Sequence, residues 1–198
     1  MTYSIIGTGE VGSALASFFV KAGIKVGVAN SRGVDAAKSV ASKLGESVVA
    51  KSLADAVKAD VIFIAVPFEK FGDVAAALPD WAGKTVVDVT NASTTPAEAQ
   101  EASGHMSSEV NAERIPGAKL VKAFNQLPVK DLTRRVPDGG KRVIFVSSDH
   151  ADASAKVARL TEELGFVPIE VGKLGEGGRL IQAPNALTFQ NLIEFEKK

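Results

Sequence analysis

Cysteine is absent from the 198 residues of this chain, which excludes disulfide bonds, thiolate nucleophiles and metal sites that need a cysteine ligand. Only two histidines are present, His105 and His150, and their placement fits neither a metal site nor a serine–histidine–aspartate arrangement. An excess of charge is also missing, because 23 Lys and Arg residues balance 23 Asp and Glu residues. This balance argues against nucleic acid and against an acidic membrane surface as partners.

Long apolar runs are missing as well, and none is long enough to cross a bilayer. The first predicted strand starts at residue 3, which leaves no room for a signal peptide, so we expect a cytoplasmic protein. A hydrophobic content of 45% with 23% charged residues is typical of globular proteins with an apolar core. Because no repeat or linker interrupts the chain, the sequence predicts one domain over residues 1–198, ending in a helical segment over about residues 173–198.

The most informative stretch lies near the start and reads Gly7-Thr8-Gly9-Glu10-Val11-Gly12. A β-prone segment precedes it and an apolar pattern of helical spacing follows it, which predicts strand, tight turn and helix. In that setting the first glycine permits the turn, the second lets the backbone approach a pyrophosphate, and the third lets the helix pack on the strand. The N–H groups of the new helix then face the phosphates. We therefore interpret the stretch as a dinucleotide-binding turn rather than a merely structural one.

The residues after the second predicted strand, at 24–29, indicate which dinucleotide binds. An NAD-binding fold usually has Asp or Glu here, about 20 residues beyond the turn. This chain has Asn30, Ser31 and Arg32 instead, so a hydroxyl and a guanidinium are available for a phosphate. Lys38, in the helix predicted over 34–44, adds positive charge. Arg32 is either a solvated loop residue or a ligand of the 2′-phosphate; its position favours the second, which selects NADP as the cofactor.

Nearly unbroken apolar strands are predicted at 60–66, 84–89, 118–124 and 141–147, as in sheets covered on both faces. The sequence therefore predicts an α/β fold with a Rossmann-type doubly wound, mostly parallel sheet and helices on both faces. Ligands of such sheets lie beyond the carboxyl ends of the strands. This adds to the predicted cofactor-binding residues those at two strand ends: Val66, Pro67, Phe68, Ala123, Phe124 and Asn125.

Other features of that edge leave alternatives open. Phe71 either leans against the nicotinamide or belongs to the core. The polar loop of residues 93–104 is typical of functional or mobile segments, and His105 after it is either a proton donor or solvated. No lysine or histidine at the end of a predicted strand offers a general acid, so no catalytic residue is predicted. This favours alignment of two redox cofactors, where the electronics reside in the cofactors.

The motifs together resemble one family. The glycine turn, Asn30-Ser31-Arg32, Ala65-Val66-Pro67 and Val121-Lys122-Ala123-Phe124-Asn125 are similar to the NADP oxidoreductases that depend on the deazaflavin coenzyme F420. The reductase domain of the STEAP metalloreductases has a similar pattern. The resemblance covers essentially the whole chain, including Gly177-Gly178-Arg179-Leu180. It implies that Thr8, Ser31, Arg32 and Lys38 contact NADP, that residues 123–125 lie near the nicotinamide, and that hydride passes between NADPH and a deazaflavin or flavin acceptor.

Other classes compete with this interpretation. Prephenate, pyrroline-carboxylate and hydroxyacid dehydrogenases open similarly, but they add a sizeable helical domain for which too little chain follows residue 171. A module that senses NADP without turnover stays open as a non-enzymatic alternative. The apolar residues of 180–195 lie on more than one face, which with the resemblance predicts a homodimer that helps to close the substrate cleft. The alternative is partial packing on the sheet followed by a frayed tail.

Overall fold

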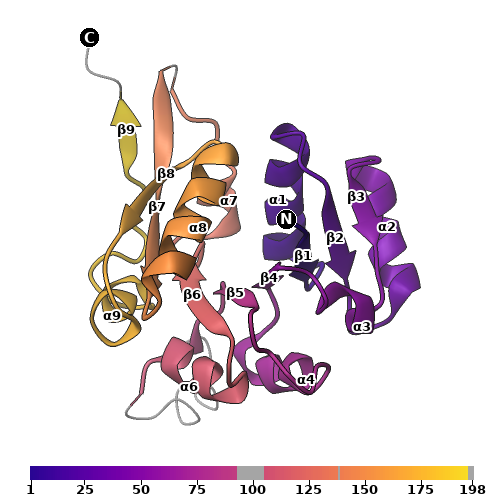
Figure 1. Cartoon of the computed structure of the whole chain (residues 1–198). Coiled ribbons are helices and arrows are strands. Elements are labelled where there is room, and N and C mark those ends of the chain that lie inside the picture. Colours follow the sequence, from indigo (N-terminus) through magenta and orange to yellow (C-terminus); the bar gives the residue numbers. More distant parts are fainter. Residues whose placement is uncertain (93–104, 138, 196–198) are drawn as a thin grey trace.

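The computed structural model describes residues 1–92, 105–137 and 139–195, and the loop predicted at 93–104 lies outside them. The described residues form an α/β fold around a nine-stranded sheet of order β3-β2-β1-β4-β5-β6-β7-β8, with β9 paired to β7 (Figure 1). The strands are β1 (Tyr3–Ile6), β2 (Val26–Ala29), β3 (Val48–Ala50), β4 (Val61–Ile64), β5 (Thr85–Asp88), β6 (Lys119–Ala123), β7 (Gly140–Ser148), β8 (Val167–Glu170) and β9 (Ile193–Phe195).

The helices connect these strands in the alternating order that the sequence predicts. They are α1 (Glu10–Lys21), α2 (Val34–Leu44), α3 (Leu53–Ala56), α4 (Phe71–Ala75), α6 (Ser107–Arg114), α7 (Val129–Leu132), α8 (Ala151–Glu163) and α9 (Arg179–Ile181), with a 3-10 turn η1 (Phe68–Lys70) before α4 and a π-helical turn η3 (Leu174–Gly178) before α9. Strands β1 to β6 pair in parallel, whereas β7 runs antiparallel to β6 and β8 runs parallel to β7. The prediction of a mostly parallel Rossmann-type sheet is confirmed.

Apolar cores on both faces of the sheet explain the unbroken apolar strands. On one face α1, α2 and α8 cover the strands, and rings such as Phe19 and Phe63 meet edge to face with centroids 5.6 Å apart. On the other face α3, α4 and α6 contribute to a second core that includes Trp81, whose Nε1 donates to Ala75 O at 3.0 Å. Neighbouring strand residues such as Phe63 and Ile64 therefore serve opposite cores.

The C-terminal part departs from the predicted helix. It is helical from Leu174 to Ile181, and the chain then turns and ends, within the described residues, in strand β9. Pro184 gives a physical reason, because a proline lacks the N–H that would continue the helix. Strand β9 pairs antiparallel with the first residues of β7, as Figure 1 shows at the end of the coloured chain.

Strand β9 lies on the same side of β7 as β6. Val143 of β7 donates its N–H to Leu192 O at 3.0 Å, and its own carbonyl accepts from Nε2 of Gln126, just beyond β6, at 3.0 Å. Both groups of a residue in an antiparallel ladder point to one side, so β9 continues the line of β6 beyond its carboxyl end. This brings the segment of residues 182–192, here named the C-terminal return, to the edge of the sheet where ligands are expected.

Candidate functional site

The glycine turn lies between β1 and α1, beside the end of β4. Gly7 has φ +107°, and a Cβ there would lie 2.1 Å from Ala65 O. A Cβ on Gly12 would lie 1.8 Å from Gly7 O, which is the close helix-to-strand packing expected of the third glycine. A Cβ on Gly9 would meet nothing within 4 Å. The fold therefore requires Gly7 and Gly12, whereas the space in front of Gly9 is open to a ligand.

Helix α1 starts directly behind that open space. Gly9 occupies its N-cap position, and no side chain from the described residues caps the helix there. The first N–H groups of a helix have no partner within it, and the helix dipole places partial positive charge at them. Glu10 starts the helix and is exposed. Since a carboxylate repels phosphate, a role for Glu10 in phosphate binding is confined to its backbone N–H.

Asn30 connects the glycine turn to the loop that follows β2. Its Nδ2 donates a hydrogen bond to Oγ1 of Thr8. Its Oδ1 accepts from the backbone N–H of Arg32 at 2.9 Å and from Arg32 Nε at 3.4 Å. One amide side chain thus fixes Thr8 and Arg32 relative to each other, although the sequence predicted only that Asn30 contacts the ligand.

Ser31, Arg32 and Lys38 are all exposed. Within the ranges that the structure describes, Arg32 forms no ion pair, and only Asn30 is seen to orient its side chain. Lys38 instead pairs with Asp35 at 3.0 Å, one turn earlier in α2. The positive charge expected at this corner therefore comes mainly from Arg32.

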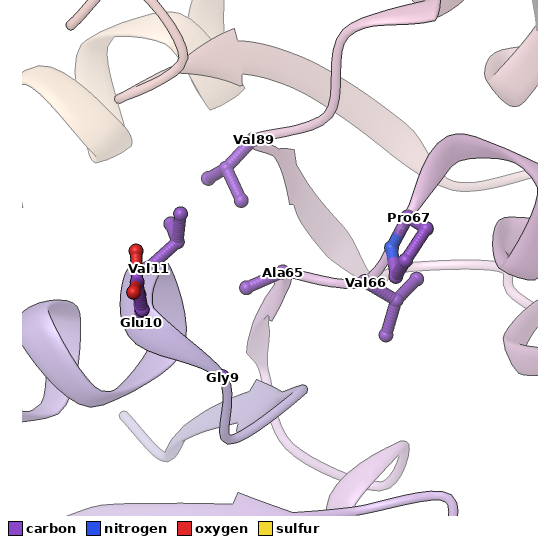
Figure 2. Close-up of a pocket in the computed structure, with 7 residues that line it drawn as sticks. All are labelled: Gly9, Glu10, Val11, Ala65, Val66, Pro67 and Val89. Atoms are coloured by element: carbon purple, nitrogen blue, oxygen red, sulfur yellow. The ribbon is translucent and has the colours of Figure 1, made fainter. Parts of the chain in front are cut away.

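Two hollows lie on either side of the residues that follow β4. The larger has a volume of about 350 Å³ and is lined by Gly9, Glu10, Val11, Ala65, Val66, Pro67 and Val89. Figure 2 shows the side chains of Val11, Ala65 and Val89 converging on it. The smaller, of about 90 Å³, shares Val66 and Pro67 and reaches Ser31, Leu53 and Lys70. Both lie at the switch point between β1 and β4, where the chain order of the sheet reverses and doubly wound folds bind ligands.

Three of the phenylalanines near this edge have buried side chains. Phe71 belongs to the core beneath α4, which decides between its two predicted roles. Phe68 is 1% exposed, and the Arg114 guanidinium lies over its ring at 4.9 Å. Phe124 packs between Phe63 and Phe166, with centroids 6.0 and 5.7 Å away. Because the rings of Phe68 and Phe124 are buried, these two residues affect the site only through the position of their backbone.

Asn125 follows β6 and carries an unused acceptor. Its Nδ2 donates to Ile181 O at 2.7 Å and to Asn91 Oδ1 at 3.1 Å, while Asn91 Nδ2 donates back to Asn125 O at 3.0 Å. Its Oδ1 is buried and accepts no hydrogen bond from the part of the chain that the structure describes. Buried acceptors are normally paired, so Oδ1 is a candidate ligand contact. Ala123 beside it is fully buried.

Sequence reasoning missed a buried charge at this edge. Lys122 of β6 and Asp88 of β5 are fully buried, with Nζ and Oδ2 3.8 Å apart. Burial lowers the pKa of Lys122, and the charge of Asp88 opposes that shift. In the sequence Lys122 lies within an apolar strand pattern. Its position next to the end of that strand was the one signal of a role at the site. Leu53 and Lys70, which line the smaller hollow, were also missed, as was Asn91, which forms hydrogen bonds with Asn125.

The two histidines lie at the surface. His105 and His150 are both exposed. Over residues 1–92, 105–137 and 139–195, no group of three or more His, Cys, Asp or Glu side chains is arranged to hold a metal ion. In those same ranges no helix has the length and apolarity needed to cross a bilayer.

The sheet, the glycine turn and the open helix N-terminus define a dinucleotide-binding protein of Rossmann type. Residues 2–92 match the family described as NADP oxidoreductase, coenzyme F420-dependent. This part of the chain is therefore similar to that family, and the resemblance drawn from its motifs is confirmed.

Three further comparisons show proteins to which the chain is similar. Metalloreductase STEAP3 of Rattus norvegicus is 27% identical over 181 residues, 91% of this chain, and the chain spans only 36% of that protein. The crystal structure of a hypothetical protein, SMa0349 from Sinorhizobium meliloti, superimposes with TM-score 0.92 at 43% identity, covering 98% of this chain and 96% of that one. A candidate F420-dependent NADP reductase from Arthrobacter sp. FB24 has the same fold, with TM-score 0.72, 24% identity and coverage of 88% and 86%.

Proposed function

We propose that this chain is a single-domain NADP(H)-dependent reductase that passes hydride from NADPH to a second, flat redox acceptor of deazaflavin or flavin type. The observation that carries the proposal is the open space in front of Gly9, bounded by the uncapped N-terminus of α1. A methyl group would fill that space without touching protein, so the fold leaves it free. The match of residues 2–92 to an NADP-dependent oxidoreductase family supports the same assignment.

Each part of NADPH has a matching part of the site. The pyrophosphate would lie at Gly9 and accept from the first N–H groups of α1. The 2′-phosphate would lie at Ser31 and Arg32, whose guanidinium is already oriented by Asn30. The smaller hollow, lined by Leu53 and Val66, would take the adenine. Val11 and Pro67 line the larger hollow, and Thr8 is held by Asn30, so these predicted contacts would border the cofactor. Lys38 would add positive charge.

The nicotinamide would lie in the larger hollow, towards Asn125. Its carboxamide N–H can satisfy the unused Oδ1 of Asn125, and Val11 and Val89 offer apolar surface to the ring. A ring fixed by its amide cannot rotate, so one face is held towards the acceptor. This arrangement aligns the reactants and requires no side-chain acid.

The reaction balances without a protein nucleophile. NADPH supplies a hydride: its C4–H bond breaks, a new bond to hydrogen forms on the acceptor ring, and NADP⁺ remains. The acceptor gains two electrons and takes its second hydrogen as a proton from water. The residues of the site bind, orient and exclude solvent.

We also propose that the protein forms a homodimer through its C-terminal part and acts in the cytoplasm. Leu180, Leu192 and Phe195 are large apolar residues that stay 43%, 44% and 54% exposed. Light scattering tests the dimer: the wild-type chain should have twice the monomer mass, and Leu180→Ser with Leu192→Ser should reduce it. Equal monomer masses for both proteins would contradict the dimer.

Stopped-flow oxidation of NADPH tests the reductase. Deazaflavin, flavin and ferric acceptors are mixed in turn with the protein and NADPH, and turnover is expected with the flat organic acceptors. Binding of NADPH without turnover of any acceptor would instead identify a redox-sensing module. Turnover of the ferric acceptor alone would contradict the acceptor class.

A further inference from the structure

Two bulky residues adopt a left-handed backbone at the same place in the fold. Phe124 has φ +60° and Phe189 has φ +65°, and no other non-glycine residue in the described ranges has a positive φ. They are far apart in the sequence, yet the N–H of Phe189 donates to the carbonyl of Gln126 at 2.7 Å. Residues with branched or aromatic side chains rarely adopt this conformation, and such strain gathers at functional sites.

Packing accounts for the conformation of only one of the two residues. The ring of Phe124 is 2% exposed and belongs to the aromatic cluster under α1. The side chain of Phe189 is 63% exposed, so little apolar burial offsets the strain of its backbone. An exposed aromatic ring held in an unfavourable conformation indicates a role outside the folded chain itself.

The C-terminal return holds Phe189 firmly at the edge of the sheet. Oε1 of Gln182 accepts from both N and Oγ of Ser107, at 2.8 and 2.7 Å. Thr188, next to Phe189, donates its hydroxyl to Asn185 O at 2.8 Å. These contacts anchor both ends of the short loop that leads to Phe189, so its backbone lies in a fixed position beside Gln126.

That position adjoins the proposed nicotinamide site. Gln126 follows Asn125 directly, and the unused Oδ1 of Asn125 is buried at the same strand end. Hydride transfer between two flat rings needs them face to face, which leaves the outer face of the acceptor in water unless a further surface covers it. An aromatic side chain supplies such a surface through apolar burial and ring stacking.

We propose that Phe189 is the platform on which the flat aromatic ring of the acceptor packs, opposite the nicotinamide. The proposal rests on the proposed function and names the part of the site that receives the second substrate. Three residues hold the C-terminal return without touching the acceptor and so act as positioning residues: Ser107, Gln182 and Gln126.

Flavin binding without turnover tests the platform. Quenching of FMN and of deazaflavin fluorescence is titrated with protein saturated with NADP⁺, which cannot donate hydride. Phe189→Ala should raise the Kd of the flavin about threefold to tenfold, as expected for the loss of one stacked ring. Phe189→Tyr, which keeps the ring, should bind as the wild type does. Ile169→Ala is the matched control, since Ile169 is an exposed apolar residue on the outer strand β8.

A second variant separates function from structure. Phe189→Gly should raise the midpoint of thermal unfolding, because glycine adopts φ +65° without strain, while it weakens flavin binding as Phe189→Ala does. If the ring of Phe189 stabilised the fold, Phe189→Gly would lower the midpoint of thermal unfolding instead. That result would overturn the platform.

The remaining outcomes are equally distinct. Equal flavin affinity in the wild type and Phe189→Ala overturns the platform and leaves the reductase standing. If Phe189→Ala binds flavin as the wild type does but no longer forms a dimer, the ring belongs to a subunit contact, and the platform is also overturned. Failure of the wild type to bind NADPH overturns the proposed function itself, which the nucleotide titration detects independently.

Discussion

Nζ of Lys122 lies 3.8 Å from Oδ2 of Asp88, and both side chains are fully buried where β5 and β6 end. Further bonds join the pair to the next residues of the chain: Nζ donates to Thr90 O at 2.9 Å, and Asp88 Oδ1 accepts from Thr90 N at 2.9 Å. Asp88 Oδ2 also accepts from Asn111 of α6 at 3.2 Å. The pair therefore anchors the strand end that leads to Asn91 and the proposed nicotinamide site.

Removing one member of this pair should be costly. Lys122→Met leaves the Asp88 carboxylate buried without a countercharge, and we expect a loss of about 3–5 kcal/mol in the free energy of unfolding, measured with urea. The double variant Lys122→Met, Asp88→Asn should lose clearly less than the sum of the single variants, since the uncompensated charge is gone. A loss below about 1 kcal/mol for Lys122→Met would show that water reaches the pair.

The glycine turn predicts opposite results at two of its positions. Gly9→Ala should keep its circular dichroism and thermal midpoint but lose NADPH binding, because the methyl group enters the space left for the pyrophosphate. Gly12→Ala should fold poorly, because its Cβ would lie 1.8 Å from Gly7 O. Intact NADPH binding in a folded Gly9→Ala would place the phosphates elsewhere.

Arg32 should make the protein bind NADPH more tightly than NADH. A charge-assisted hydrogen bond contributes about 1.5–3 kcal/mol, so Arg32→Ala should weaken NADPH binding by about one to two decades and leave NADH nearly unchanged. Lys43→Ala is a suitable control, because Lys43 is an exposed cation in the last turn of α2, the helix that follows Arg32. Isothermal titration with both nucleotides measures the effect, and equal dissociation constants for NADPH and NADH in the wild type would refute the assignment of NADP.

The hydrogen bonds between Thr2 near the N-terminus and Asp60 should make the stability of the fold depend on pH. The Thr2 backbone N–H and hydroxyl donate to Asp60 Oδ2 at 2.7 and 3.0 Å, and these bonds hold the pKa of Asp60 below its ordinary value. A lowered pKa gives a contribution that is complete above the unfolded-state pKa, about 3.9, and is lost as pH falls through the folded-state pKa.

Thermal unfolding of Asp60→Asn from neutral to acid pH checks this sign. Its midpoint should lie below that of the wild type at neutral pH, and the difference should shrink below about pH 4. Asp73→Asn serves as control, since Asp73 is an exposed residue that pairs with Lys70 at 3.5 Å. A difference that grows in acid would contradict the role of Asp60.

Local patterns predicted the nucleotide half of the fold well. The helix predicted over 34–44 is α2 with the same bounds, because Gly33 and Gly45 stop the apolar pattern at both ends. The strands around the glycine turn were also expected within a residue or two, since each is a short apolar run between turn residues. Here the sequence signal and the tertiary contacts agree.

The second half depends on contacts that no local pattern encodes. Strand β9 forms because β7 offers it an unpaired edge, and its residues alone also fit a helix face. Lys122 looked like a strand residue, because its counterion Asp88 is on another strand. Phe124 was predicted beside the nicotinamide, yet its left-handed backbone places its ring in the aromatic cluster. In each case a partner distant in the sequence decides the outcome.

The reversal of β7 has a consequence for how this protein can diverge. Because β7 and β8 run against the other strands, the helix that follows β7 starts at the opposite edge of the sheet. Beyond β6, contacts at the ligand edge therefore come from residues 124–137 and from the C-terminal return. Those residues can differ between relatives without disturbing the glycine turn. A chimaera of this chain that carries residues 172–195 of a relative should therefore show the acceptor preference of that relative and keep the nucleotide affinity of this chain.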